Sequence, residues 1–170
     1  MRFCAIFLLA LALNAPAAAQ QPSVTELFDQ FGLFGVWAIN CDREPALDNP
    51  RVTVLRPSSA GPVIENDDAG PGTYVNHYTI VSAKRLDDDT LSVRVLYRPG
   101  TRQQQLQDQV WRVRDNSRRT LFNKPKGERA RVKDGIIVGS GTETPVLHRC
   151  NDTPVKHRAA LLGQTRRFPG

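Results

Sequence analysis

The stretch Leu91-Ser-Val-Arg-Val-Leu-Tyr-Arg98 decides the fold class of this chain of 170 residues. Its apolar face carries Leu91, Val93, Val95 and Tyr97, and its other face carries Ser92, Arg94 and Arg98. Alternation with a period of two is typical of a strand that buries one side, and a helix would need a period of 3.6. The sequence therefore predicts antiparallel β structure around this segment.

Turn residues divide the neighbouring sequence into further strands. The run Thr73 to Lys84 ends at Asp87-Asp88-Asp89, so it should form a hairpin with the strand that follows. Two more hairpins are expected: Leu106 to Arg114 with Arg118 to Lys124 around Asp115-Asn116-Ser117, and Glu128 to Lys133 with Ile136 to Ser140 around Asp134-Gly135. Asp-Gly is favoured in tight hairpin turns.

The remaining strands come from the two ends of this region. Val36 to Asn40 and Arg51 to Arg56 read as strands, and Val146 to Cys150 reads as the last one. Pro57 to Gly72 reads as a long loop, with Asp67-Asp68 as a polar turn within it. Eight or nine short strands predict an all-β antiparallel up-and-down barrel of about eight strands, and a β-sandwich is the alternative.

A short helix is expected before the first strand, over Val24 to Phe34. Ser23 is a suitable N-cap, and Glu26 three residues later completes a capping box. Gly32 and Gly35 end the pattern. The apolar residues Leu27, Phe28, Phe31 and Phe34 suit a plug packed against a larger body.

The first 19 residues have the pattern of a secretory signal peptide. Met1-Arg2 leads into the apolar run Phe3 to Leu13, and Ala17-Ala18-Ala19 supplies small residues before a cleavage site. The apolar run is shorter than the roughly 20 residues that span a bilayer. We therefore expect a periplasmic or secreted protein that is not membrane-spanning, with an N-terminal arm and helix (20–34), a barrel domain (35–150) and a basic C-terminal tail (151–170).

Cleavage would leave two cysteines, Cys41 and Cys150. An even cysteine count in an exported chain favours a disulfide. Closing a loop of roughly 110 residues stabilises a fold by about 4 to 5 kcal/mol on the chain-entropy view. A thiol metal site or redox pair is the alternative, but such sites usually have a short Cys-x-x-Cys spacing.

The chain is basic, and this narrows its partners. Removing Arg2 with the signal segment lowers the 23 Lys and Arg by one against 17 Asp and Glu, so the net charge falls from +6 to +5. Candidate partners are anionic envelope components, such as lipid headgroups or wall polymers, and acidic proteins. No aromatic-basic motif favours nucleic acid. Arginines on water-facing strand surfaces, such as Arg118-Arg119, also explain the charge by solubility alone.

Few residues have the spacing that catalysis or metal binding needs. His77, His148 and His157 are scattered, and Gly139-Ser140-Gly141 lacks the spacing of a nucleophile elbow. Asp87-Asp88-Asp89 lacks the alternating oxygens of a calcium loop. The sequence therefore predicts no enzyme, no catalytic residue, no cofactor and no metal site.

Gly35-Val36-Trp37, at the start of the first strand and after a short amphipathic segment, resembles the lipocalin and wider calycin pattern. In that superfamily the Trp closes one end of an eight-stranded barrel, which implies a central cavity for an apolar or amphipathic ligand. The chain is also similar to small periplasmic barrel inhibitors of metalloproteases. That second resemblance implies that the arm Gln20 to Glu26 would enter a protease cleft.

The leading expectation is an exported binding protein for a small amphipathic or anionic ligand. Candidate ligand-binding residues are Trp37, Tyr78, Tyr97 and Trp111, with Arg112 at the rim. A filled core is the alternative for the same aromatic residues, because small barrels are usually filled by side chains. A protein-interaction or protease-inhibitor module, or an envelope factor held to anionic polymers, would use the loops, the arm or the arginines instead.

Overall fold

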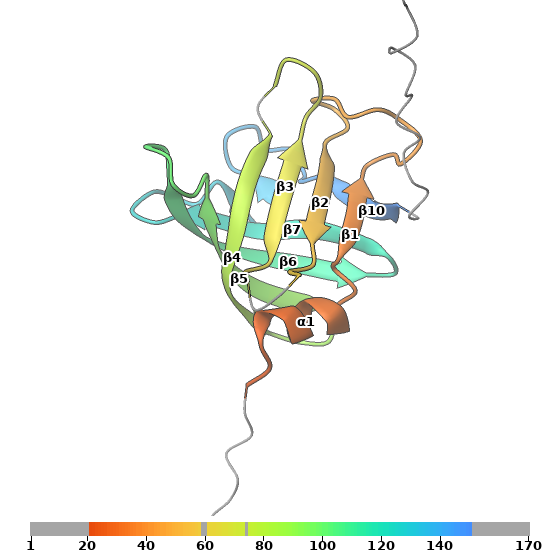
Figure 1. The fold of residues 1–170 in the computed structure, drawn as a ribbon. Coiled ribbons are helices and arrows are strands. Elements are labelled where there is room, and N and C mark those ends of the chain that lie inside the picture. The colour runs from red at the N-terminus through yellow and green to blue at the C-terminus, as the bar shows by residue number, and fades with distance from the viewer. Residues whose placement is uncertain (1–20, 59–60, 74, 151–170) are drawn as a thin grey trace, which may run out of the picture.

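The computed structural model of the chain describes residues 21–58, 61–73 and 75–150 (Figure 1). Within these ranges, helix α1 (Val24–Gln30) precedes the strands β1 (Gly35–Ala38), β2 (Arg51–Leu55), β3 (Ile64–Asp68), β4 (Asn76–Arg85), β5 (Thr90–Tyr97), β6 (Gln105–Arg114), β7 (Ser117–Pro125), β8 (Val132–Lys133), β9 (Ile136–Ile137) and β10 (Val146–Cys150). The expected signal segment, the C-terminal tail and Tyr74 lie outside the described residues.

Eight strands of the described chain form a closed antiparallel barrel. Strands β1 to β7 pair in sequence order, and β10 pairs with both β1 and β7. The all-β barrel prediction is confirmed, because a sandwich would leave β1 and β7 as edges of separate sheets. Full closure removes the exposed edges on which sheets aggregate.

The two small strands β8 and β9 form a hairpin beside the seam of the barrel. β10 pairs with β7 only over Ser117–Arg119, whereas β8 pairs with β7 at Asn123. β10 and β8 therefore pair with the same edge of β7, at different positions along the strand. The hairpin covers the part of the β7 edge that β10 does not reach.

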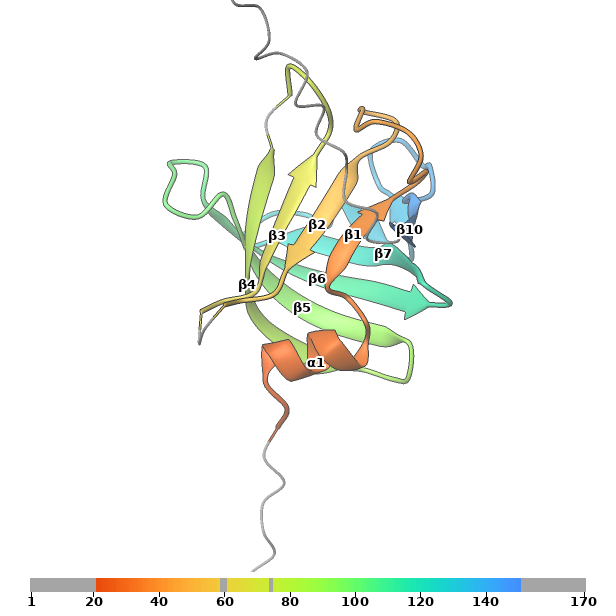
Figure 2. The same ribbon diagram turned by 45° about the vertical axis from the view of Figure 1, so that its right-hand side comes forward.

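Helix α1 closes one end of the barrel, as Figures 1 and 2 both show. The expected capping box is present: Ser23 Oγ accepts from the amide of Glu26 at 3.2 Å, and Glu26 Oε2 accepts from the amide of Ser23 at 2.7 Å. The helix stops at Gln30, four residues before the expected end, because Gly32 adopts a φ of 62°. The four apolar residues expected to form the plug are buried, at 2% for Leu27, 0% for Phe28, 9% for Phe31 and 8% for Phe34.

The three expected hairpins are confirmed. β4 pairs with β5, β6 with β7, and β8 with β9. The turn residues Asp115 and Asn116 have φ values of 51° and 56°, and Asp134 and Gly135 have 51° and 77°. Two successive residues in the left-handed region match the right-handed twist of the flanking strands, which is why Asn, Asp and Gly occur there.

The expected long loop Pro57 to Gly72 is wrong, because β3 runs through it and pairs with β2 on one side and β4 on the other. The polar turn expected at Asp67-Asp68 is wrong for the same reason. Val63, just before β3, is 2% exposed, and the next two residues on the same side, Glu65 and Asp67, line the pocket inside the barrel. Two of these three inward positions are therefore carboxylates. The strand looked like a loop because its buried face is polar.

The disulfide between Cys41 and Cys150 is confirmed, with Cα atoms 5.4 Å apart and a sequence separation of 109. Cys41 lies just beyond β1, and Cys150 ends β10. Since β1 and β10 are neighbours in the closed barrel, the bond ties the first strand region to the last.

The half of the lumen next to α1 is filled by apolar side chains. Trp37 is 1% exposed and donates from Nε1 to the carbonyl of Leu33 at 2.9 Å. Trp111, also 1% exposed, contacts the ring of Phe28 with centroids 6.0 Å apart. A filled core therefore describes this half of the barrel, and the opposite half contains the site described next.

Candidate functional site

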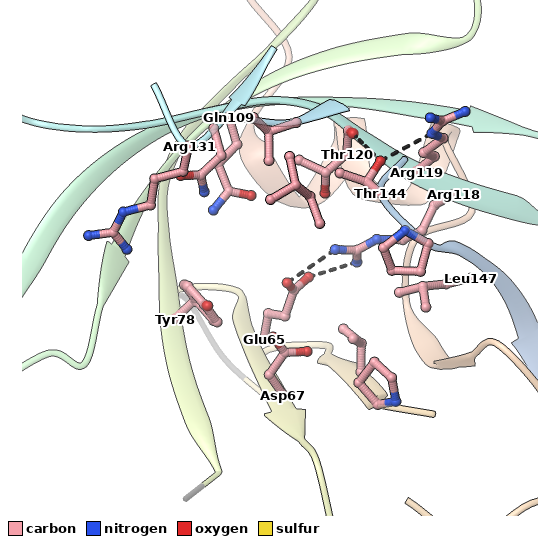
Figure 3. A pocket seen from close by; sticks show the side chains of 16 residues that line it. Glu65, Asp67, Tyr78, Gln109, Arg118, Arg119, Thr120, Arg131, Thr144 and Leu147 are labelled. Atoms are coloured by element: carbon pink, nitrogen blue, oxygen red, sulfur yellow. Dashed lines mark hydrogen bonds and ion pairs between the residues drawn. The ribbon is translucent and has the colours of Figure 1, made fainter. Parts of the chain in front are cut away.

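A pocket of about 290 Å³ lies inside the barrel, in the half away from α1 (Figure 3). It is lined by Pro50, Val52, Glu65, Asp67, Tyr78, Gln109, Arg118, Arg119, Thr120, Asn123, Arg131, Val132, Ile137, Thr144, Pro145 and Leu147. These residues come from β2, β3, β4, β6, β7, the β8–β9 hairpin and β10 with the loop before it. The barrel interior and the hairpin at its seam build the site together.

A buried ion pair crosses the lumen at this pocket. Arg118 Nη1 lies 2.7 Å from Glu65 Oε2, and Arg118 Nη2 lies 3.1 Å from Glu65 Oε1, as Figure 3 shows. The two side chains are 6% and 8% exposed. This bidentate geometry satisfies both carboxylate oxygens, which a buried charge pair requires.

The ion pair rests on the apolar core. The Arg118 guanidinium lies over the Trp111 ring, with Cζ 4.2 Å from the centroid. Phe28 of α1 makes an edge contact with Trp111, with the ring planes 67° apart. Contacts therefore run from the helix through Trp111 to Arg118, between the filled half of the barrel and the pocket.

Asp67 and Tyr78 form the wall of the pocket on β3 and β4. The pKa of the Asp67 carboxyl is raised from its ordinary 3.8 to about 7, chiefly by burial and also by the nearby Glu65 charge, while Arg118 acts in the opposite direction. Burial, with the charges of Asp67 and Glu65, also raises the pKa of the Tyr78 hydroxyl, which therefore stays protonated. Within the described part of the chain, the Asp67 carboxylate has neither a hydrogen bond nor an ion pair.

The facing wall is a ladder of amides along β6. Trp111 Nε1 donates to Gln109 Oε1 at 2.8 Å, and Gln109 Nε2 donates to Gln107 Oε1 at 3.2 Å. Gln107 Nε2 donates to Gln105 Oε1 at 3.4 Å, and Asn123 Nδ2 of β7 donates to Gln107 Oε1 at 3.0 Å. Gln107 and Gln109 are 4% and 8% exposed. The ladder satisfies amides that would be costly to bury alone.

A third wall comes from the segment between β9 and β10, which is fixed by Thr144 and Arg119. Thr144 Oγ1 donates to the carbonyl of Thr120 at 2.7 Å. Arg119 donates from Nε to Thr144 Oγ1 at 3.1 Å and from Nη2 to the carbonyl of Gly135 at 2.9 Å, and it pairs with Glu143 at 3.2 Å. These bonds hold the hairpin against β7, where Val132 and Ile137 face the pocket.

The structure brings one of the five expected ligand-binding residues, Tyr78, into the lining of this pocket. Trp111 lies one layer below, under Arg118. Tyr97 packs on Tyr78 with ring centroids 5.2 Å apart and donates to Asn76 Oδ1 at 2.9 Å. Trp37 belongs to the core near α1, and Arg112 is an exposed residue that lies 4.0 Å from Asp89.

Sequence reasoning missed the charged and amide residues of the pocket. The sequence places Arg118 in a water-facing basic cluster, and that interpretation is wrong for this residue, which is 5% exposed. A usable signal was present in Gln105, Gln107 and Gln109, because they share the period-two face of Trp111. The sequence carries no comparable signal for Glu65 or Asp67, because the residues around them are mostly polar or turn-forming.

Two further observations concern metal groups and membrane-spanning helices among the described residues. They contain no group of three or more His, Cys, Asp or Glu side chains arranged to hold a metal ion. They also contain no helix long and apolar enough to cross a membrane. In the arm, Ser23 is the helix N-cap and Glu26 lies in the first turn, so these residues are part of a capped helix.

Comparison with protein-family models, with curated proteins and with solved structures gives no match for this chain. The eight-stranded antiparallel barrel is consistent with the architecture that Gly35-Val36-Trp37 implied, and the family itself is not shown. Function must therefore be argued from the pocket.

Proposed function

We propose that this chain is an exported, non-enzymatic binding protein that holds a small amphipathic molecule in the open half of its barrel. The observation that carries the proposal is the pocket of about 290 Å³ inside the barrel. This volume is near the lower end of the range of about 300–1,000 Å³ typical of small-molecule sites. A ligand bound in the barrel lumen would make this chain similar to lipocalins in its mode of binding as well as in its barrel architecture.

The division of the lining supports an amphipathic ligand. Val52, Val132, Ile137 and Leu147, with Pro50 and Pro145, supply apolar surface. Asp67, Tyr78, Gln109 and Asn123 supply polar groups at fixed positions. A mostly apolar wall with a few fixed polar groups is the usual composition of a site that orients a small ligand.

The charged residues of the pocket favour an amphipathic ligand over an anionic one. Each arginine that lines the pocket already has a carboxylate partner: Glu65 for Arg118, Glu143 for Arg119 and Glu128 for Arg131. An anionic ligand would have to compete with these partners. It would also meet Asp67, which repels it when ionised.

Two observations support the remaining parts of the proposal. The Cys41–Cys150 disulfide fits an oxidising compartment such as the periplasm or the exterior of the cell. A non-enzymatic role fits the pairing of Glu65 with Arg118, because a carboxylate held at both oxygens is a poor proton acceptor for a substrate.

Native mass spectrometry of the protein purified from its exported fraction tests the proposal. We expect a co-purifying small-molecule mass on the wild type. Ile137→Trp should remove it by filling the pocket, whereas Val138→Trp should keep it, because Val138 is the next residue and is 56% exposed. A bare wild-type protein that also shows no NMR shifts with hexylamine, hexanol or hexanoate at millimolar concentration would overturn the proposal.

A further inference from the structure

The direction of every amide in the β6 ladder is fixed by its two ends. The indole Nε1 of Trp111 is only a donor, so Gln109 must present its oxygen there and its nitrogen to Gln107. At the other end Arg131, also only a donor, directs Nη2 to Gln105 Oε1 at 3.4 Å. The ladder is therefore consistent in one direction along its whole length.

This direction determines what Asn123 offers to the pocket. Gln107 presents its oxygen to Asn123, so Asn123 must place Nδ2 there. Its Oδ1 atom is then left buried, and no described residue donates to it. A buried acceptor without a donor is costly, and a ligand that supplies the donor recovers that cost.

The charge inside the pocket has the opposite sign to the charge of the whole chain. The formal net charge of the chain is +6, but Arg119 and Arg131 are neutralised by Glu143 and Glu128. The remaining charged residues of the lining are the carboxylates of Glu65 and Asp67 and the guanidinium of Arg118. Their net charge is one negative charge when Asp67 is ionised. The Asp67 carboxylate and the Asn123 oxygen are both acceptors in need of a donor.

We propose that the ligand carries a positively charged hydrogen-bond donor at its polar end, an ammonium or guanidinium group that binds the Asp67 carboxylate, with Asn123 Oδ1 as a second acceptor. This inference rests on the proposed function and names the ligand class of the same pocket. An ammonium group has three donors and a guanidinium has five, so either can serve acceptors on more than one wall. The apolar body of the ligand packs against Val52 and Leu147.

A neutral donor satisfies the same geometry less well. A hydroxyl group can donate to Asp67, but it leaves the negative charge of the half-buried carboxylate uncompensated. A cation compensates this charge in a site where burial weakens the screening by water. The preference for a cation over an isosteric alcohol is therefore the distinguishing property of this site.

The test uses three probes of one length: hexylamine, hexanol and hexanoate, each titrated into the mature disulfide-bonded protein at pH 8 and followed by ¹⁵N NMR. We expect hexylamine to bind at least tenfold more tightly than hexanol, and hexanoate to bind most weakly. Asp67→Asn should remove the preference for the amine. Asp88→Asn makes the same change of charge in the exposed β4–β5 turn and should leave the preference intact.

Asn123→Leu is a second variant that leaves the Asp67 charge in place. It removes the Oδ1 acceptor, and Gln107 Oε1 keeps the donor from Gln109. We expect it to weaken hexylamine severalfold and to affect hexanol less. If Asp67→Asn proves to be poorly folded, an unchanged amine preference in Asn123→Leu would still count against the role of Asn123.

The pH dependence is a further readout. Asp67 is faced by Glu65 on its own strand, by Tyr78 on β4 and by Arg118 on β7, while β2 places Val52 opposite it. With the Asp67 pKa at about 7, protonation between pH 8 and pH 5 should weaken hexylamine by about 100-fold if only the ionised form binds. Asp67→Asn should show no such dependence.

The outcomes separate this inference from the proposed function. Equal binding of hexylamine and hexanol, or a preference for hexanoate, overturns the cationic ligand class and leaves the pocket as a binding site. Failure of all three probes to perturb the pocket signals overturns the proposed function and the inference with it.

Discussion

Breaking the Glu65–Arg118 pair from one side should be among the most destabilising changes in this barrel. The substitution Arg118→Met keeps an unbranched apolar side chain over Trp111 but leaves the Glu65 carboxylate, 8% exposed, without its bidentate partner. Removing one member of a buried pair costs about 3–5 kcal/mol, because the remaining charge is neither solvated nor compensated. Domains of ordinary size have about 5–15 kcal/mol of stability in total.

Equilibrium urea unfolding, with the disulfide intact and Trp fluorescence as the signal, measures this loss. We expect Arg118→Met to lower the free energy of unfolding by about 3–5 kcal/mol. The double variant Glu65→Leu/Arg118→Met should recover most of it, since no buried charge remains. The matched control is Arg94→Met, which removes an exposed pair with Asp108 at 2.7 Å, with side chains 51% and 53% exposed. That change should cost less than about 1 kcal/mol.

Two results would refute the reasoning. A loss below about 1 kcal/mol in Arg118→Met would mean that the buried pair behaves like a surface pair. A double variant no more stable than Arg118→Met would mean that the loss comes from packing against Trp111 and not from the stranded Glu65 charge.

Three further predictions concern other parts of the fold. The Asp67 pKa is raised from 3.8 to about 7, so the folded state binds a proton more tightly than the unfolded state, and the free energy of unfolding should fall as pH rises from about 4 to about 7. The fall is at most about 4 kcal/mol, at about 1.4 kcal/mol per pKa unit. Urea titrations across this pH range should show the fall in the wild type but not in Asp67→Asn. Replacing both Cys41 and Cys150 by Ser should lower the free energy of unfolding by about 4–5 kcal/mol on the chain-entropy view, and a loss below about 1 kcal/mol by the same assay would contradict it. Gly70→Ala should lower the free energy of unfolding by more than about 1 kcal/mol, because a Cβ there would lie 2.4 Å from the Pro45 carbonyl oxygen, at a φ of +97°. Gly61→Ala is the control, since no atom lies within 4 Å of its Cβ. Equal melting temperatures of the two variants would refute the steric argument.

Part of the candidate site was accessible from the sequence. The alternation in β5 and β6 predicts which residues face the interior, and Tyr78 was expected there on the same basis. The position of Arg118 was not accessible, because an arginine on a strand is usually on the water side. Its inward orientation depends on Glu65, which lies 53 residues away and on the opposite wall.

The sequence by itself determined the strands, the hairpin turns and the capped helix, because these depend on residues close together in the chain. Period-two alternation, Asp-Gly and Asp-Asn turns and the Ser23–Glu26 capping box are all local signals. Only the tertiary structure decided that β3 is a strand, that β10 closes the barrel and that Asp67 and Asn123 line the same pocket. Each of these depends on pairing between distant segments, and the energy of a buried charge or amide is set by the partners that such pairing brings to it.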